Sequence, residues 1–482
     1  MKPTKLIKSS FWITVSTFAQ RFFALLSNLI LARLLLPSEF GVIAIAYVFW
    51  SFFTLFTQSS TGFFILYKGT EDKRYLDTTY TIGLIIGLIV ALGLVVTAPF
   101  VAIFFNEPNL KLLLLPYALN LQLSTVYYTY AAVMTSQMQH RELANINFIS
   151  SAARLILTTG AALAGFSYWS FAVGDTAFWL LGSFLARDQS GHHLQISLNA
   201  KLRNEVISYC AGEVGSSFGF YANSNLDNFV AGKFLGQANL GYYNLAYQLS
   251  MALSTILNPV INQLGIPLFA KMNHPQQQKK ALFEITKEIA FLATPLFILV
   301  FLVLDKSTLA LIFGANWTPV ASILPWLLFA AYFRVLNSPL RSMLVAKGLP
   351  KINATVNLTI APIAVVGFYL GAKYGGVIGV SIAAALVLGI VWTLYWWWLG
   401  CNALGWSIGE FMIPCFQPML ISLLPLLISV SLPSIVKAIA FGPIYLIFLR
   451  FFAAQQFFNY YKFAISMVHR IFNKNDGNSL YK

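Results

Sequence analysis

Three arginines lie within long apolar stretches of the sequence, where a charged side chain is costly. They are Arg21, Arg154 and Arg334. A charge at the centre of a bilayer costs at least about 2.5 to 3.5 kcal/mol, so such residues usually face a water-filled interior. The guanidinium group offers fixed, paired donors to phosphate or carboxylate. The three arginines therefore predict a cationic cavity that binds an anionic substrate.

Polar neighbours of these arginines occur at helical spacing. Asn28 lies two helical turns beyond Arg21, on the same face of a predicted helix. Asn228 belongs to a second polar stripe, which begins at Glu213. Because polar stripes in apolar helices should face a shared interior, Asn28 and Asn228 join the three arginines as candidate substrate-binding residues.

Three acidic residues, Asp175, Glu213 and Asp227, lie in or beside apolar stretches. Carboxylates within a membrane can couple transport to protons or sodium, so all three are candidate ion-coupling residues. In the alternative interpretation the arginines pair with Glu213 or Asp175 and only hold helices together. Asp227 could equally be a solvated or capping residue near the outer surface.

The composition is that of a polytopic membrane protein. Of 482 residues, 58% are hydrophobic and 10% are charged, and the mean hydropathy is +0.71, whereas soluble domains carry roughly 25% charged residues. Apolar stretches of about 20 residues are long enough to cross a bilayer as helices. The net charge of +15 is spread between such stretches, which favours a membrane-topology signal over nucleic-acid binding.

The apolar stretches predict an all-α fold of about 14 transmembrane helices. Their approximate bounds are 11–36, 41–67, 78–104, 110–138, 144–166, 168–186, 206–232, 240–269, 283–304, 319–346, 353–371, 376–400, 409–431 and 435–457. With the N-terminus in the cytoplasm, most of the 31 Lys and Arg residues fall on the cytoplasmic side, as membrane proteins prefer. Both termini are therefore expected in the cytoplasm.

The sequence contains an internal repeat. Residues 16–47 align without a gap with residues 216–247, and eight positions are identical: Ser16/Ser216, Phe18/Phe218, Leu26/Leu226, Asn28/Asn228, Leu35/Leu235, Gly41/Gly241, Ala46/Ala246 and Tyr47/Tyr247. The two copies are separated by an even number of predicted crossings, so they insert with the same orientation. Parallel repeats related by an axis along the membrane normal are a transporter architecture, with the substrate path between the halves.

The repeat predicts three domains. Two pseudo-symmetric six-helix bundles occupy residues 1–190 and 200–402, and an appended helix pair with a cytoplasmic tail occupies residues 403–482. The loops are too short for a catalytic domain, and no catalytic or metal-binding motif occurs in a suitable context. We therefore expect no enzymatic activity, no metal and no cofactor.

Five further motifs follow one another along the chain. They are LARLLLPSEFG at 31–41, NLAY at 244–247, LNPVI at 257–261, FGANW at 313–317 and RVLNSPLRSMLVAKG at 334–348. In this order they resemble the polysaccharide transporter branch, the Wzx-like O-antigen or colanic-acid exporters, of the multidrug/oligosaccharidyl-lipid/polysaccharide exporter superfamily. The resemblance runs from the first predicted helix through the twelfth.

The resemblance implies a flippase of the bacterial cytoplasmic (inner) membrane that works by alternating access. Its substrate would be an undecaprenyl-pyrophosphate-linked oligosaccharide, moved from the inner to the outer leaflet for surface polysaccharide biosynthesis. Implied partners are this anionic lipid-linked oligosaccharide and membrane lipids, with a polysaccharide polymerase and chain-length machinery as candidates, and proton or sodium coupling. Members of the family tend to line their cavity with basic residues, and Arg21, Arg154 and Arg334 fit that pattern.

Three alternatives remain open. A drug or cation antiporter of the same superfamily would place acidic residues in the cavity, whereas the most deeply placed charges here are arginines. A peptidoglycan lipid-precursor flippase would share the anionic lipid pyrophosphate. A membrane enzyme that polymerises lipid-linked sugars would need a sizeable outer loop, and the outer loops here are short.

Overall fold

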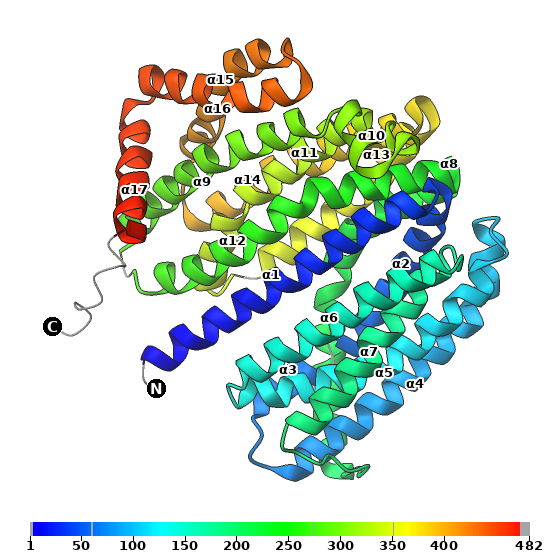
Figure 1. Cartoon of the computed structure of the whole chain (residues 1–482). Coiled ribbons are helices and arrows are strands. Elements are labelled where there is room, and N and C mark those ends of the chain that lie inside the picture. Colours follow the sequence, from blue (N-terminus) through cyan, green and yellow to red (C-terminus); the bar gives the residue numbers. More distant parts are fainter. Residues whose placement is uncertain (1–2, 59–60, 273, 350, 473–482) are drawn as a thin grey trace. The chain divides into compact units, whose positions relative to one another are not determined.

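The computed structural model describes residues 3–58, 61–272, 274–349 and 351–472, and every regular element within these ranges is a helix (Figure 1). The predicted all-α class is confirmed. The helices are α1 (Pro3–Leu34), α2 (Pro37–Gln58), α3 (Thr61–Lys68), α4 (Lys73–Phe104), α5 (Leu110–Ser136), α6 (His140–Leu163), α7 (Trp169–Gln189), α8 (Ala200–Ala270), α9 (Pro275–Val303), α10 (Lys306–Phe313), η1 (Ala315–Trp317), α11 (Val320–Leu336), α12 (Ser338–Ala346), α13 (Lys351–Ala384), η2 (Ala385–Val391), α14 (Trp392–Leu404), α15 (Gly409–Val430), α16 (Ser434–Phe452) and α17 (Ala454–Phe472).

Several helices are longer than one membrane crossing. In the described part of the chain, nine stretches are long and apolar enough to cross a membrane. Helix α8 alone has 71 residues, although about 20 suffice for a crossing. Each of two long helices contains a glycine with non-helical backbone angles: Gly236 in α8 (φ 80°, ψ 171°) and Gly376 in α13 (φ 58°, ψ −143°). Each glycine lies where one predicted segment gives way to the next. The chain is an integral multi-pass membrane protein, and the count of fourteen crossings stays a prediction.

The break in α8 falls where the sequence repeat requires it. Helix α1 ends at Leu34 and α2 begins at Pro37, and a shift of 200 residues carries the gap between them onto Gly236. Glycine adopts this positive φ without the steric penalty that a side chain would bring. Helices α1 and α2 therefore correspond to the parts of α8 before and after Gly236.

Two glycines that the repeat pairs, Gly41 and Gly241, touch the backbone of the opposite copy. A Cβ on Gly41 would lie 1.9 Å from the carbonyl oxygen of Gln237, and a Cβ on Gly241 would lie 1.8 Å from that of Pro37. Pro37 and Gln237 are themselves equivalent positions of the repeat. Such reciprocal contact is the mark of a local two-fold axis, here at a crossing of α2 and α8 that is too close for any side chain.

A second equivalent pair, Arg33 and Lys233, binds helix ends. Arg33 Nε donates to the carbonyl oxygen of Ile312 near the end of α10, and Lys233 Nζ donates to that of Phe104 at the end of α4, both at 2.6 Å. Cations are favoured at helix C-termini because the last carbonyls carry partial negative charge. In both copies, the equivalent basic residue thus binds a carbonyl oxygen at the C-terminal end of another helix.

By its internal contacts the chain divides into two compact units. Unit 1 comprises residues 1–249, 309–327 and 353–388, and unit 2 comprises residues 250–308, 328–352 and 389–482. In unit 1, α1 lies against α6, α6 against α7, and α4 against α5 (Figure 1). In unit 2, α9 packs against α15 and α16 around Phe291, Phe441 and Tyr445. The predicted domains 1–190, 200–402 and 403–482 remain predictions.

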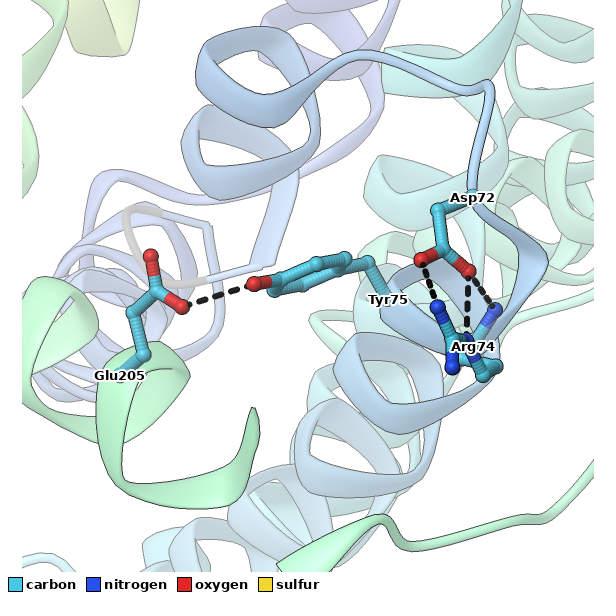
Figure 2. Close-up of polar contacts among 4 residues, drawn as sticks. All are labelled: Asp72, Arg74, Tyr75 and Glu205. Carbon is cyan, nitrogen blue, oxygen red and sulfur yellow. Dashed lines mark hydrogen bonds and ion pairs between the residues drawn. The ribbon is translucent and has the colours of Figure 1, made fainter. Parts of the chain in front are cut away.

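An acidic side chain near the start of α8 joins this helix to α3 and α4 within unit 1. The Glu205 carboxylate lies 2.5 Å from Lys68 Nζ and accepts a hydrogen bond of 3.0 Å from the Tyr75 hydroxyl, and Figure 2 shows the contact with Tyr75. These hydrogen bonds, from Lys68 first and then Tyr75, hold the pKa of Glu205 below its usual value. At the start of α4, hydrogen bonds from Arg74, also drawn in Figure 2, lower the pKa of Asp72.

Replacing Gly41 or Gly241 with alanine should destabilise the protein, because the new methyl group would overlap a backbone carbonyl. We expect each variant to lose about 1 to 3 kcal/mol of stability, the usual cost of overpacking. The measurement is the melting temperature of the detergent-solubilised protein, and the two variants should lose similar amounts because the contacts are reciprocal.

Gly160→Ala on α6 is the matched control, since a Cβ there would meet nothing within 4 Å and alanine favours a helix. The close crossing of α2 and α8 would be contradicted if G41A and G241A melted at the same temperature as G160A.

Candidate functional site

Unit 1 encloses a cavity of about 240 Å³ between residues of α1, α2, α6, α7 and α8. Seven neutral side chains that can form hydrogen bonds line it: Gln20, Ser27, Asn28, Tyr47, Ser151, Asn244 and Gln248. Arg154 is the one charged side chain among the lining residues that the structure describes. The cavity therefore contains two of the predicted substrate-binding residues, Arg154 and Asn28.

The guanidinium group of Arg154 forms an ion pair with Asp175 on the neighbouring helix α7. Arg154 Nε lies 2.7 Å from Asp175 Oδ1, and the side chain of Asp175 is only 8% exposed. Burial of an unpaired carboxylate would cost several kcal/mol, so each charge requires the other. Of the interpretations left open by the sequence, internal pairing with Asp175 is the one that the structure shows for Arg154.

Two tyrosines complete the coordination of the Asp175 carboxylate. The hydroxyl groups of Tyr47 and Tyr117 donate to Asp175 Oδ2 at 2.7 and 3.0 Å. The Tyr47 hydroxyl also accepts a hydrogen bond of 3.1 Å from Arg154 Nη2. Both carboxylate oxygens are thus occupied. Arginine has five N–H donors, and toward the described residues Arg154 uses donors on Nε and Nη2 only. The remaining donors can bind a ligand.

A glycine brings the two charged helices close enough for this pair. A Cβ on Gly174, next to Asp175 on α7, would lie 1.7 Å from Thr158 Oγ1 and 2.9 Å from the carbonyl oxygen of Arg154. Only glycine allows such a close helix crossing. The local sequence of α7 therefore sets the distance between the two charges.

A chain of amide side chains runs from the cavity to Asp227. Asn28 Nδ2 donates to Gln248 Oε1, Gln248 Nε2 donates to Asn244 Oδ1 at 2.5 Å, and Asn244 Nδ2 donates to Asn228 Oδ1 at 3.4 Å. Asn228 in turn donates to Asp227 Oδ1 from its backbone N–H at 2.8 Å and from Nδ2 at 3.2 Å. The predicted residues Asn28, Asn228 and Asp227 thus belong to one network, although only Asn28 lines the cavity.

The other predicted residues lie elsewhere. Arg21 is exposed on α1 and is not among the residues that line the cavity. Arg334 belongs to unit 2, where it is half-buried and its Nη1 lies 3.6 Å from Met251 Sδ. Glu213 lies on α8, but its side chain is outside the described part of the chain.

Among the residues that bond to the ion pair or form the amide chain, Tyr47, Tyr117, Asn244 and Gln248 were not predicted. Tyr47 is one of the identical positions of the repeat, and Asn244 and Gln248 are spaced by one helical turn. These signals were present in the sequence. They are weak, because a tyrosine or an amide in an apolar helix indicates a polar partner without identifying it.

Comparisons of the sequence with known proteins point to proteins of polysaccharide biosynthesis. The model of a polysaccharide biosynthesis protein family matches residues 30–322. The chain is 22% identical to the lipopolysaccharide biosynthesis protein WzxC of Escherichia coli (strain K12), over 90% of this chain and 88% of that protein. It is 23% identical to the teichuronic acid biosynthesis protein TuaB of Bacillus subtilis (strain 168), over 83% of this chain and 81% of that protein.

A solved structure supports the fold. The lipid II flippase MurJ, in an inward closed conformation, matches with a TM-score of 0.74 over 93% of this chain and 99% of that chain. The sequence identity is 14%, so this likeness concerns the fold alone.

Replacing Asp175 with asparagine should destabilise unit 1, because Arg154 would lose its ionic partner. Hydrogen bonds to charged groups contribute roughly 1.5 to 3 kcal/mol each, so we expect a loss of that order. Chemical denaturation in detergent measures it, and a double-mutant cycle with Arg154→Met should show that the two losses are not additive.

Asp188→Asn on the same helix is the matched control, because Asp188 is exposed. If D175N were as stable as D188N, the ion pair would not contribute to holding α6 and α7 together.

Proposed function

Because the chain belongs to this family of polysaccharide biosynthesis proteins, we propose that it exports a lipid-linked oligosaccharide with an anionic headgroup. The resemblance expected from the sequence motifs is confirmed by the family match and by relatives that act in lipopolysaccharide and teichuronic acid biosynthesis. In the proposal, the substrate moves from the inner to the outer leaflet of the bacterial cytoplasmic membrane, without covalent chemistry.

The observation that carries the proposal is a guanidinium group in a cavity between membrane-crossing helices. A pyrophosphate cannot enter hydrocarbon unaided, because an uncompensated charge there costs many kcal/mol. The free N–H donors of Arg154 can replace part of its hydration, since arginine binds phosphate through paired hydrogen bonds. The lipid tail can meanwhile remain in the bilayer.

Asp175 gives this cavity a way to release a bound headgroup. An anionic headgroup and the Asp175 carboxylate compete for the same guanidinium group, 2.7 Å from the carboxylate in this structure. Protonation of Asp175 frees Arg154 for the headgroup, and loss of the proton restores the ion pair and displaces the headgroup. Each event favours one state of an alternating-access cycle, so transport is coupled to the proton. A sodium ion that neutralises the carboxylate would act in the same way.

We propose that Arg21 and Arg334 contact the headgroup elsewhere along its path. Both lie on helices within membrane-crossing stretches, where an arginine usually marks a substrate pathway. Neither is part of the cavity lining, so they serve a different stage of the cycle from Arg154.

Replacing Arg21, Arg154 or Arg334 singly with alanine should abolish or strongly reduce export. We expect loss of surface polysaccharide together with accumulation of lipid-linked repeat units on the inner leaflet, at normal membrane levels of the protein. Quantifying both pools in cells that carry each variant provides the measurement.

Arg203→Ala is the control, because Arg203 is exposed near the start of α8, and it should export normally. Normal export by all three test variants would rule out binding of the headgroup by these arginines.

The same cells distinguish the other transporters of the superfamily. Accumulation of peptidoglycan precursors with cell lysis would identify a peptidoglycan lipid-precursor flippase. Unchanged polymer with altered drug sensitivity would identify a drug or cation antiporter.

A further inference from the structure

We infer that the amide chain Asn28–Gln248–Asn244–Asn228 provides a subsite for sugar hydroxyl groups of the substrate's glycan, with Asp227 as its positioning residue. This inference rests on the proposed function, because it assigns a second part of the same substrate to the same cavity. It also gives Asp227 a role other than ion coupling.

The charge of the cavity favours a sugar at the amide chain. The positive charge of Arg154 is matched by Asp175 at 2.7 Å, and the other polar groups that line the cavity are neutral amides and hydroxyls. A hydroxyl group both donates and accepts a hydrogen bond, and an amide offers both partners. A cavity of about 240 Å³ is slightly smaller than the roughly 300–1,000 Å³ of pockets for drug-sized ligands, so it suits one sugar ring.

Asp227 fixes the direction of the whole chain of amides. An amide can be turned over without changing its shape, so its hydrogen-bond partners decide its orientation. A carboxylate only accepts hydrogen bonds, so Asn228 must present its N–H groups to Asp227, from 2.8 and 3.2 Å. The side-chain oxygen of Asn228 then accepts a hydrogen bond from Asn244. Asn244 and Gln248 have the same orientation, because each donates through its nitrogen toward Asp227 and accepts through its oxygen from the next amide.

This oriented chain of amides ends at the cavity, with the side chain of Asn28. Its Nδ2 donates to Gln248, which leaves Oδ1 to accept a hydrogen bond from a ligand. Each amide also carries a second N–H group that can donate. The Asp227 carboxylate, 1% exposed, is thereby linked through four amides to a wall of fixed donors and acceptors.

Aromatic residues supply the apolar part of the same cavity. Phe23, Phe40 and Phe171 line it together with the amides. Ligand sites typically combine apolar and aromatic walls with a few placed polar groups, and a sugar ring has both an apolar C–H face and polar edges. The lining of the cavity matches this pattern.

The test compares two probes on the purified full-length protein in lipid nanodiscs. One is the lipid-linked repeat unit extracted from the host cells, and the other is undecaprenyl pyrophosphate without sugar. Equilibrium binding of both is measured for the unaltered protein, for Asn28→Leu, Gln248→Met and Asp227→Asn, and for Asn145→Leu. Asn145 is exposed on α6 and does not line the cavity, so N145L is the matched control.

We expect the unaltered protein and N145L to bind the sugar-bearing probe about tenfold more tightly than the bare lipid. N28L and Q248M should lose this preference while their affinity for the bare lipid stays the same. D227N should lose it as well, because an asparagine can donate to Asn228 and no longer fixes the direction. The proton dependence of transport should be unchanged in D227N.

Other results overturn the inference. Variants that keep the sugar preference, or that lose affinity for both probes equally, would show that the amides only hold helices together. Loss of proton dependence in D227N would return Asp227 to ion coupling. If the unaltered protein bound both probes equally, the sugar subsite alone would fail, whereas binding of neither probe would refute the proposed function itself.

Discussion

A charge within a bilayer must be matched, and in this protein the match is the ion pair between Arg154 and Asp175. The pair lies on neighbouring helices, α6 and α7, at 2.7 Å. Gly174 sets the helix crossing that permits this distance, and Tyr47 and Tyr117 satisfy the second carboxylate oxygen. Removal of either charged partner would leave the other charge unpaired in an apolar surrounding, which is costly. The same arrangement leaves guanidinium donors available in the cavity.

The internal repeat preserves the backbone and varies the polar side chains. The backbone requirements recur in both copies, as the reciprocal crossing at Gly41 and Gly241 shows. At other equivalent positions the residues differ: Ser27 corresponds to Asp227, and Val48 to Gln248. Asn244 corresponds to Ala44, so the first copy lacks Asp227, Asn244 and Gln248, three residues of this network. The two copies therefore share a backbone arrangement, and Asn244 and Gln248, which occur only in the second copy, line the cavity together with Arg154.

The sequence predicted the features that depend on pattern. Hydrophobic length predicted a helical membrane protein, and the position of Arg154 in an apolar stretch predicted a polar interior. The repeat predicted that the gap between α1 and α2 recurs in α8, where Gly236 breaks the helix. Neutral residues such as Tyr117 and Gln248 were not predicted, because their role depends on which helices meet. The choice of Asp175 as the partner of Arg154 was one of several possibilities until the crossing of α6 and α7 was known.

In the transport cycle that we propose, Asp175 competes with an anionic headgroup for Arg154. The test is the affinity of the unaltered protein and of folded D175N for undecaprenyl pyrophosphate in nanodiscs at neutral pH. Folded D175N should bind several-fold more tightly, because its neutral side chain no longer competes with the headgroup for the guanidinium group of Arg154. Equal or weaker binding by folded D175N would contradict the competition and leave the ion pair a purely structural contact.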